Sequence, residues 1–240
     1  KVHFGEKGNT SYIRPQFIRK VVDKVKEGQG KPFLTDANTL YSGARANAVD
    51  HLITAIENGF PFSVVNAPLI IADGLTGKDY EKVEVNLKHF KQVHIGSAIV
   101  HADSLIAISH FKGHEATGFG GVLKNVGMGS GSRSGKQQMH SGLLPRIVTE
   151  KCKSCRKCMI WCPVQAISMN EHACIEYEKC YGCGECTVTC PHGAIKINWK
   201  TEPDDIQEKI VEYVYGVLKD KKDRAGFTTF IMGVTPECDC

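Results

Sequence analysis

The sequence lacks any apolar run that is long enough to cross a membrane. No stretch approaches the ~18 consecutive apolar residues of a membrane-spanning helix, and the first residues carry no signal-peptide pattern. An excess of one charge is also missing, because 30 Lys and Arg residues stand against 26 Asp and Glu residues, a formal net charge of +4. This balance argues against a nucleic-acid-binding protein. We therefore expect a soluble protein with no membrane and no nucleic acid among its partners.

Two nucleotide-binding fingerprints and one metalloprotease fingerprint are absent as well. No G-x-G-x-x-G opens a helix. When Gly135 and Lys136 are aligned with the G-K of a P-loop, Ser130 stands where the first Gly is needed and Gln137 where Ser or Thr is needed. His110 and His114 are four residues apart, but no Glu follows the first of them as in H-E-x-x-H. These absences argue against a P-loop nucleotide hydrolase, a dinucleotide-binding dehydrogenase and a zinc hydrolase.

Cysteine, in contrast, is abundant and ordered. Eight of the 11 cysteines fall into two runs of the form C-x₂-C-x₂-C-x₃-C-P, the spacing that builds bacterial-type 4Fe–4S sites. The first run is Cys152, Cys155, Cys158 and Cys162 before Pro163, and the second is Cys180, Cys183, Cys186 and Cys190 before Pro191. The two runs are copies of one internal repeat, which starts at Cys152 and again at Cys180. Structural zinc favours paired C-x₂-C units, so neither zinc nor disulfides fit this pattern well.

The spacing also predicts which cysteines share a cluster. Three cysteines of a run lie in one loop, and the fourth faces the other cluster, so the ligands cross over. The first predicted ligand set is Cys152, Cys155, Cys158 and Cys190, and the second is Cys180, Cys183, Cys186 and Cys162. We expect Ile167 and Ile195 to pack against the two clusters. Residues 149–198 closely resemble the two-cluster bacterial ferredoxins.

Two bound 4Fe–4S clusters would change the expected net charge of the protein and also bear on the cellular compartment in which it is expected. Eight thiolates subtract ~8 charges and two oxidised cores return ~4, so the loaded protein is near neutral. Exposed clusters and free thiols favour a reducing cytoplasm.

Strands that alternate with helices surround the cysteine runs. Helices are expected from Pro15 until Gly28 and at 45–58, 96–102 and 203–219. Strands are expected at 31–35, 63–65, 69–72, 83–85, 92–95, 104–109 and 227–234, with a loop at 1–14. The pattern predicts an α/β fold, a mostly parallel sheet with helices, carrying an inserted α+β 4Fe–4S domain. The expected domains are an α/β domain over 1–148, a two-cluster domain over 149–198, and a C-terminal helix and strand over 199–240 that return to the α/β domain.

A glycine-rich stretch, residues 109–136, follows the buried strand at 104–109. Ligands of α/β sheets lie at the carboxyl ends of strands, and glycines let backbone N–H groups approach an anion. The predicted ligand-binding residues are Lys112, His114, Gly120, Gly121 and Lys124, with Arg133 as a further cation, in a loop that faces the inserted domain. Asp36, Ser42 and Arg45 end another strand and are candidates for the same crevice. The alternative is a flexible connection without a ligand.

Three cysteines lie outside the two runs. Cys174, between Ala173 and Ile175, is expected to be a small core residue. Cys238 and Cys240 form a C-x-C pair, for which a shared metal or redox role and no role at all both remain open.

A wider resemblance covers most of the chain. The segments 9–15, 35–43 and 109–129, followed by the cysteine runs, resemble the iron–sulfur proteins of the domain-of-unknown-function family 362. The resemblance implies a ferredoxin-bearing redox protein of anaerobic bacteria or archaea and no settled substrate. The stretch 114–124 is also similar to a glycine-rich segment of lactate-racemase-like proteins.

Three functions follow as hypotheses. The first is an electron-transfer protein that relays single low-potential electrons between redox partner proteins through two 4Fe–4S clusters. The alternative is a reductase, an oxidoreductase of unknown substrate whose α/β domain binds a small anionic ligand. The third is a structural role for the clusters, which two adjacent sites disfavour because one would suffice to staple the fold.

Overall fold

The structure is a computed structural model that describes residues 1–41, 43–114, 117–140, 144–162, 164–180, 185–197 and 205–236. The chain divides into two compact units: unit 1 comprises Lys1–Gly135 and Gln207–Cys240, and unit 2 comprises Lys136–Ile206. The segment 149–198, predicted to be a domain of its own, lies within unit 2, and its limits stay a prediction. No helix in the described ranges is long and apolar enough to span a membrane.

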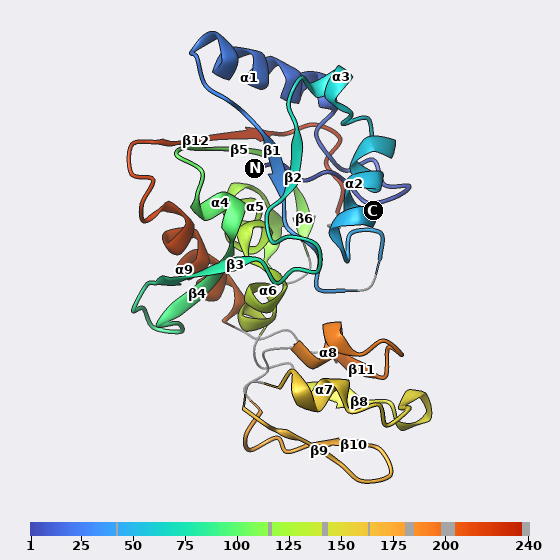
Figure 1. The fold of residues 1–240 in the computed structure, drawn as a ribbon. Coiled ribbons are helices and arrows are strands. Elements are labelled where there is room, and N and C mark those ends of the chain that lie inside the picture. Colours follow the sequence, from blue (N-terminus) through green and yellow to red (C-terminus); the bar gives the residue numbers. More distant parts are fainter. Residues whose placement is uncertain are drawn as a thin grey trace. The chain divides into compact units, whose positions relative to one another are not determined.

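Unit 1 contains parallel and antiparallel strand pairs with helices around them (Figure 1). Its strands are β1 (Leu34–Asp36), β2 (Leu69–Ile71), β3 (Tyr80–Glu84), β4 (Gln92–Gly96), β5 (Leu105–His110), β6 (Lys112–His114), β7 (Gly118–Gly120) and β12 (Ala225–Phe230). Its helices are α1 (Pro15–Glu27), α2 (Ala48–Glu57), α3 (Phe62–Val65), α4 (Ser97–Val100) and α5 (Val122–Ser130). Along the chain, α6 (Arg133–Met139) and α9 (Ile206–Leu218) run across the limits between the units.

The first residues of the chain connect two parallel strand pairs, β1–β2 and β5–β12. The backbone N of Val2 donates to Thr35 O at 3.0 Å, and the backbone N of Ile108 donates to Lys1 O at 3.0 Å. This extended segment therefore lies between β1 and β5 (Figure 1). Val2 and Phe4 are buried in the core. Within the described residues no helix or strand precedes α1, which agrees with the loop expected over 1–14. The sequence did not indicate that Val2 and Phe4 of this segment pack in the core, where burial of their apolar side chains stabilises the fold.

Helix α1 shows why the predicted elements form. Pro15 occupies its first turn, where a missing N–H costs nothing. Ile18 and Val22, four residues apart, share the buried face. In α2, the Asn47 side chain accepts a hydrogen bond from the backbone N of Asp50 and so caps the helix.

Two expectations about unit 1 need correction. The segment at 63–65 is helix α3 and not a strand, because Pro61 starts a helical turn and Asn66, with φ of 57°, ends it. The sheet is not mostly parallel: within the described residues β1–β2 and β5–β12 are parallel, whereas β3–β4 and β6–β7 are antiparallel. The fold class of the chain is thus mixed α/β.

The glycine-rich stretch is also not a loop. Its described residues form the β6–β7 hairpin followed by α5 and α6. Glycine inside these helices permits close packing, since a Cβ at Gly127 would lie 2.5 Å from Ile210 O of α9. A Cβ at Gly135 would overlap His94 O of β4. Much of the glycine content therefore serves helix packing.

Unit 2 is built from two copies of one strand–helix–strand pattern. The first copy is β8 (Pro145–Ile147), α7 (Lys157–Ile160) and β9 (Ile167–Met169), with the short 3₁₀ helix Thr149–Lys151. The second copy is β10 (Ala173–Ile175), α8 (Glu185–Thr189) and β11 (Ile195–Ile197). Each element of the second copy follows its counterpart at the interval that separates Cys180 from Cys152, so the repeat read from the cysteines extends to the backbone.

The strands of the two copies pair with one another. β8 pairs with β11 and β9 pairs with β10, both antiparallel. The backbone N of Val148 donates to Ala194 O at 2.7 Å, and the equivalent N of Glu176 donates to Ala166 O at 2.8 Å. The two copies therefore form one small α+β body whose apolar core includes Ile167 and Ile195.

Candidate functional site

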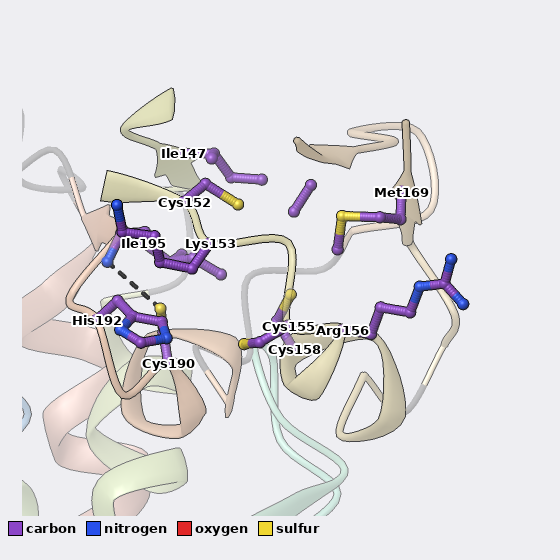
Figure 2. A pocket seen from close by; sticks show the side chains of 12 residues that line it. Ile147, Cys152, Lys153, Cys155, Arg156, Cys158, Met169, Cys190, His192 and Ile195 are labelled. Carbon is purple, nitrogen blue, oxygen red and sulfur yellow. Dashed lines mark hydrogen bonds between the residues drawn. The ribbon is translucent and has the colours of Figure 1, made fainter. Parts of the chain in front are cut away.

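A small pocket, partly open to solvent, lies between the two cysteine runs of unit 2 (Figure 2). Three cysteines of the first run line it, together with one of the second. They are Cys152, Cys155, Cys158 and Cys190. Cys152 and Cys155 lie in the loop before α7, Cys158 lies on α7, and Cys190 directly follows α8. The structure thus brings together the four cysteines that were predicted to share one cluster, and their role as ligands stays a prediction.

Backbone N–H groups point at several of these sulfur atoms. Cys190 Sγ accepts a hydrogen bond from the N of Ala194 at 3.3 Å (Figure 2). In the other copy, Cys162 Sγ accepts one from the N of Ala166 at 3.2 Å. The backbone N–H of Ala173, followed by that of Ser154, lowers the pKa of Cys152. These bonds stabilise negative charge on sulfur, as a thiolate ligand requires.

Burial acts in the opposite direction on Cys158. Loss of solvation raises the pKa of its thiol, because a buried thiolate has little water to stabilise it.

Left-handed backbone conformations shape the loop that carries the first cysteines. Ser154 has φ of 49° and Arg156 has φ of 61°, a region that costs a residue with a Cβ about 1 kcal/mol. Farther along, Gln165 has φ of 52°, and Gly193, the equivalent position of the second copy, has φ of 58°. The two copies therefore share an unusual backbone turn as well as their cysteines.

The second predicted ligand set is described in part. Cys162, Cys180 and Cys186 belong to the same buried cluster as Ile167 and Ile195, and Cys183 lies outside the described residues. The cysteines that the structure describes are not joined in disulfides.

One of the three cysteines outside the runs lies within the described residues, and it differs from expectation. Cys174 is exposed and is not a core residue, because its neighbours Ala173 and Ile175 occupy the buried face of β10. Cys238 and Cys240 lie outside the described residues.

A cluster and a single metal ion make different demands on the residues around this pocket. Within the described ranges, no group of three or more His, Cys, Asp and Glu side chains is arranged to hold one metal ion. An iron–sulfur cube makes a different demand, since each of its four thiolates binds a different iron. Four cysteines line this pocket, and a cluster bound to them stays a prediction. Lys153, Arg156 and His192 also line the pocket, and the cations Lys153 and Arg156 would offset part of the roughly −2 net charge of a thiolate-bound oxidised cube.

In unit 1, the predicted ligand-binding residues lie on the β6–β7 hairpin and the start of α5. Lys112 is opposite Gly120 in the hairpin, Gly121 precedes α5, and Lys124 is in its first turn. A Cβ at Gly120 would lie 3.7 Å from both Lys112 Cγ and Lys124 Cδ. His114 Nδ1 accepts a hydrogen bond from the backbone N of Thr117 at 3.2 Å. The two lysines therefore converge on Gly120, and a ligand there stays a prediction.

A buried ionic cluster surrounds Asp36 at the end of β1. Asp36 Oδ1 accepts a hydrogen bond from Lys1 Nζ at 2.7 Å, and Oδ2 lies 3.6 Å from Arg45 Nη1 and 3.8 Å from His51 Nε2. Burial works against the charged carboxyl, but Lys1, His51, His3 and Arg45 outweigh it and hold the pKa of Asp36 well below its usual range. Asp36 and Arg45 meet as expected, and Ser42 lies outside the described residues.

Nothing in the sequence indicated that Lys1 belongs to one of these sites. Lys1 joins the Asp36 cluster to α5, because its Nζ also donates to Asn125 Oδ1 at 3.0 Å. Only the pairing of the first residues with β1 and β5 makes this possible. His192 did have a signal, since it stands two residues after Cys190 in the second run.

One comparison with known proteins gives a match. The family model described as "Domain of unknown function (DUF362)" matches residues 1–240. No curated protein matches the chain.

Proposed function

We propose that this chain, which belongs to the DUF362 family, is an electron-transfer protein whose unit 2 contains a two-cluster ferredoxin-type domain inserted into an α/β unit. The observation that carries the proposal is the crossed cysteine set, in which Cys190 of the second run lines one pocket with Cys152, Cys155 and Cys158 of the first. Such crossing is the ligand pattern of two-cluster ferredoxins. A 4Fe–4S cluster supplies one-electron redox chemistry when it is bound.

The residues around the cysteines have distinct tasks in this proposal. Cys152, Cys155, Cys158 and Cys190 hold one cluster, and Cys162, Cys180, Cys183 and Cys186 hold the other. Ile167 and Ile195 keep water from the interior side of the sites, since each is only 5% exposed. The N–H groups of Ala166 and Ala194 stabilise charge on sulfur, which tunes a cluster potential.

Two sites in one small body support electron transfer over a purely structural role. A structural metal needs one site, whereas the repeat duplicates its strands, helix and cysteines. Closely spaced redox centres pass an electron between partner proteins, and the partners we propose are therefore redox proteins.

The test is a reductive titration of protein that is purified and reconstituted without oxygen. We expect uptake of about two electrons per chain, one per cluster, with reversible bleaching of the visible absorption. The control is the double variant Cys155→Ser with Cys183→Ser, which removes one ligand from each set and should lose most of this uptake. A wild-type protein that binds stoichiometric zinc and takes up no electrons would contradict the proposal.

A second candidate function is a reductase in which the α/β unit binds an anionic substrate. The approach of Lys112 and Lys124 to Gly120 favours it, because two adjacent lysines attract phosphate or carboxylate. Titration calorimetry with inorganic phosphate and malonate tests it. Lys124→Ala and His114→Ala should weaken binding at least several-fold. The control Lys20→Ala, which changes an exposed side chain of α1, should not. Unchanged binding in both variants would favour the electron carrier alone.

A further inference from the structure

We propose that the first cysteine run is the docking surface for an acidic one-electron carrier protein. This inference rests on the proposed electron-transfer function and assigns its partner-binding face. The docking surface consists of the exposed residues Arg146, Lys151, Lys153, Arg156, Lys157, Ile160 and Trp161.

Charge is the first observation. Residues 146–162 contain five cations, all exposed, and the single carboxylate Glu150. The equivalent residues of the second copy, 174–190, contain the carboxylates Glu176, Glu178 and Glu185 and the single cation Lys179. A patch of one sign steers a partner of the opposite sign and raises its association rate. Of the two segments, the one around the first run therefore carries the positive excess.

An exposed apolar pair is the second observation. At the end of α7, Ile160 is 79% exposed and Trp161 is 51% exposed. The second copy has the smaller Val188 and Thr189 at these positions. Tryptophan is enriched among residues that dominate binding energy, where polar neighbours exclude water from it. Ile160 and Trp161 with a basic surround thus have the composition of a small transient interface.

The backbone at Arg156 is the third observation. Arg156 adopts a left-handed conformation, and the second copy has Gly184 at the equivalent position. Glycine adopts this conformation without the steric cost that Cβ imposes. The first copy therefore retains a cation at a position where glycine is the better residue for stability, and residues in such conformations concentrate at functional sites.

Arg156 and Lys153 also connect the surface to the redox site. Both are exposed, and both line the pocket of Cys152, Cys155, Cys158 and Cys190. A carrier docked on these cations would therefore lie beside the first ligand set. In the transfer the reduced carrier gives up one electron and this chain accepts one, and no covalent bond forms or breaks.

The experiment uses a reduced acidic [2Fe–2S] ferredoxin as the probe and the full chain loaded with iron. Stopped-flow absorbance gives the second-order rate constant of electron transfer at low and high ionic strength. We expect the triple variant Lys153→Glu, Arg156→Glu, Lys157→Glu to react at least about tenfold more slowly at low salt, with the difference shrinking as salt screens the charges. The control is Lys20→Glu, Lys31→Glu, Lys222→Glu, which changes net charge equally at exposed sites of unit 1 and should react almost as fast as wild type.

A second readout needs no substitution. Carbodiimide coupling joins contacting lysines and carboxylates, and we expect cross-links from the probe to Lys151, Lys153 and Lys157. Cross-links confined to other lysines, or equal rates for both triple variants, would overturn the docking proposal. Iron and sulfide content is measured on every sample. Loss of the clusters from wild type would instead contradict the proposed function, so the two failures are distinguishable.

Discussion

The two copies in unit 2 agree in backbone and differ in surface. Their helices and strands recur at one constant interval, and their left-handed turns at Gln165 and Gly193 coincide. Their charges are opposite, since the segment around the first run is basic and the segment around the second is acidic. Packing and cysteine geometry constrain the shared backbone, whereas exposed positions are free to diverge. The comparison indicates that one backbone architecture carries two segments of opposite net charge.

Each copy also contributes residues to the other copy's strand pairs and pocket. β8 pairs with β11, β9 pairs with β10, and Cys190 lines the pocket of the first run. Neither copy can therefore complete its sheet or its site alone. A change in one copy should appear in the function of the other.

The largest effect is expected from removing a cysteine that one copy is predicted to contribute to the other copy's cluster. Cys190→Ser should release the cluster of the first run and expose Cys152, Cys155 and Cys158 to alkylation, with loss of about four irons per chain. Cys162→Ser should expose the second run instead. Iodoacetamide labelling under anaerobic conditions, read by mass spectrometry, distinguishes the two patterns. Exposure of Cys180, Cys183 and Cys186 in the Cys190→Ser variant would mean that each run holds its own cluster.

An intermediate effect is expected from the matched isoleucines. Ile167→Ala and Ile195→Ala each remove a buried side chain that is 5% exposed, so each should lower the local free energy of unfolding by about 2–5 kcal/mol. Hydrogen exchange of the amides in β9 and β11 measures these losses. Because the sites are equivalent, the two values should agree within about 1 kcal/mol. A strong asymmetry would show that the copies differ in their cores as well as on their surfaces.

The smallest effect is expected at the left-handed position that distinguishes the copies. Arg156→Gly should raise the stability of the first loop by about 1 kcal/mol, because glycine avoids the steric cost of φ of 61°. Arg156→Ala removes the same charge but keeps Cβ, so it is the matched control and should show no such gain. Ser154→Gly should gain less, since Ser154 Oγ donates to Glu171 O at 2.6 Å. Hydrogen exchange of α7 reports all three, and equal values for glycine and alanine at position 156 would contradict the backbone argument.

Local patterns predicted the elements whose residues carry their own signal. Helix α1 is expected from Pro15 until Gly28 and observed at Pro15–Glu27, because Pro15 and the spacing of the buried Ile18 and Val22 indicate it locally. Strand β5 is expected at 104–109 and observed at Leu105–His110. The cysteine spacing likewise predicted a set of four cysteines that together line one pocket, and their role as cluster ligands stays a prediction.

Features that depend on contacts between distant segments could not be predicted from local sequence patterns. The glycines at 127 and 135 lower helix propensity, yet they lie in helices where contact with α9 and β4 leaves no room for a Cβ. Val2 and Phe4 lie in the core because β1 and β5 flank them, a partnership between segments far apart in the chain. The ionic cluster at Asp36 depends on the same pairing, and no spacing of residues along the chain predicts this cluster.

Metal and sulfide analysis of anaerobically reconstituted protein tests the central claim most directly. Two complete cysteine sets predict about eight irons and eight acid-labile sulfides per chain. Four or fewer irons, or stoichiometric zinc in their place, would contradict the two-cluster account.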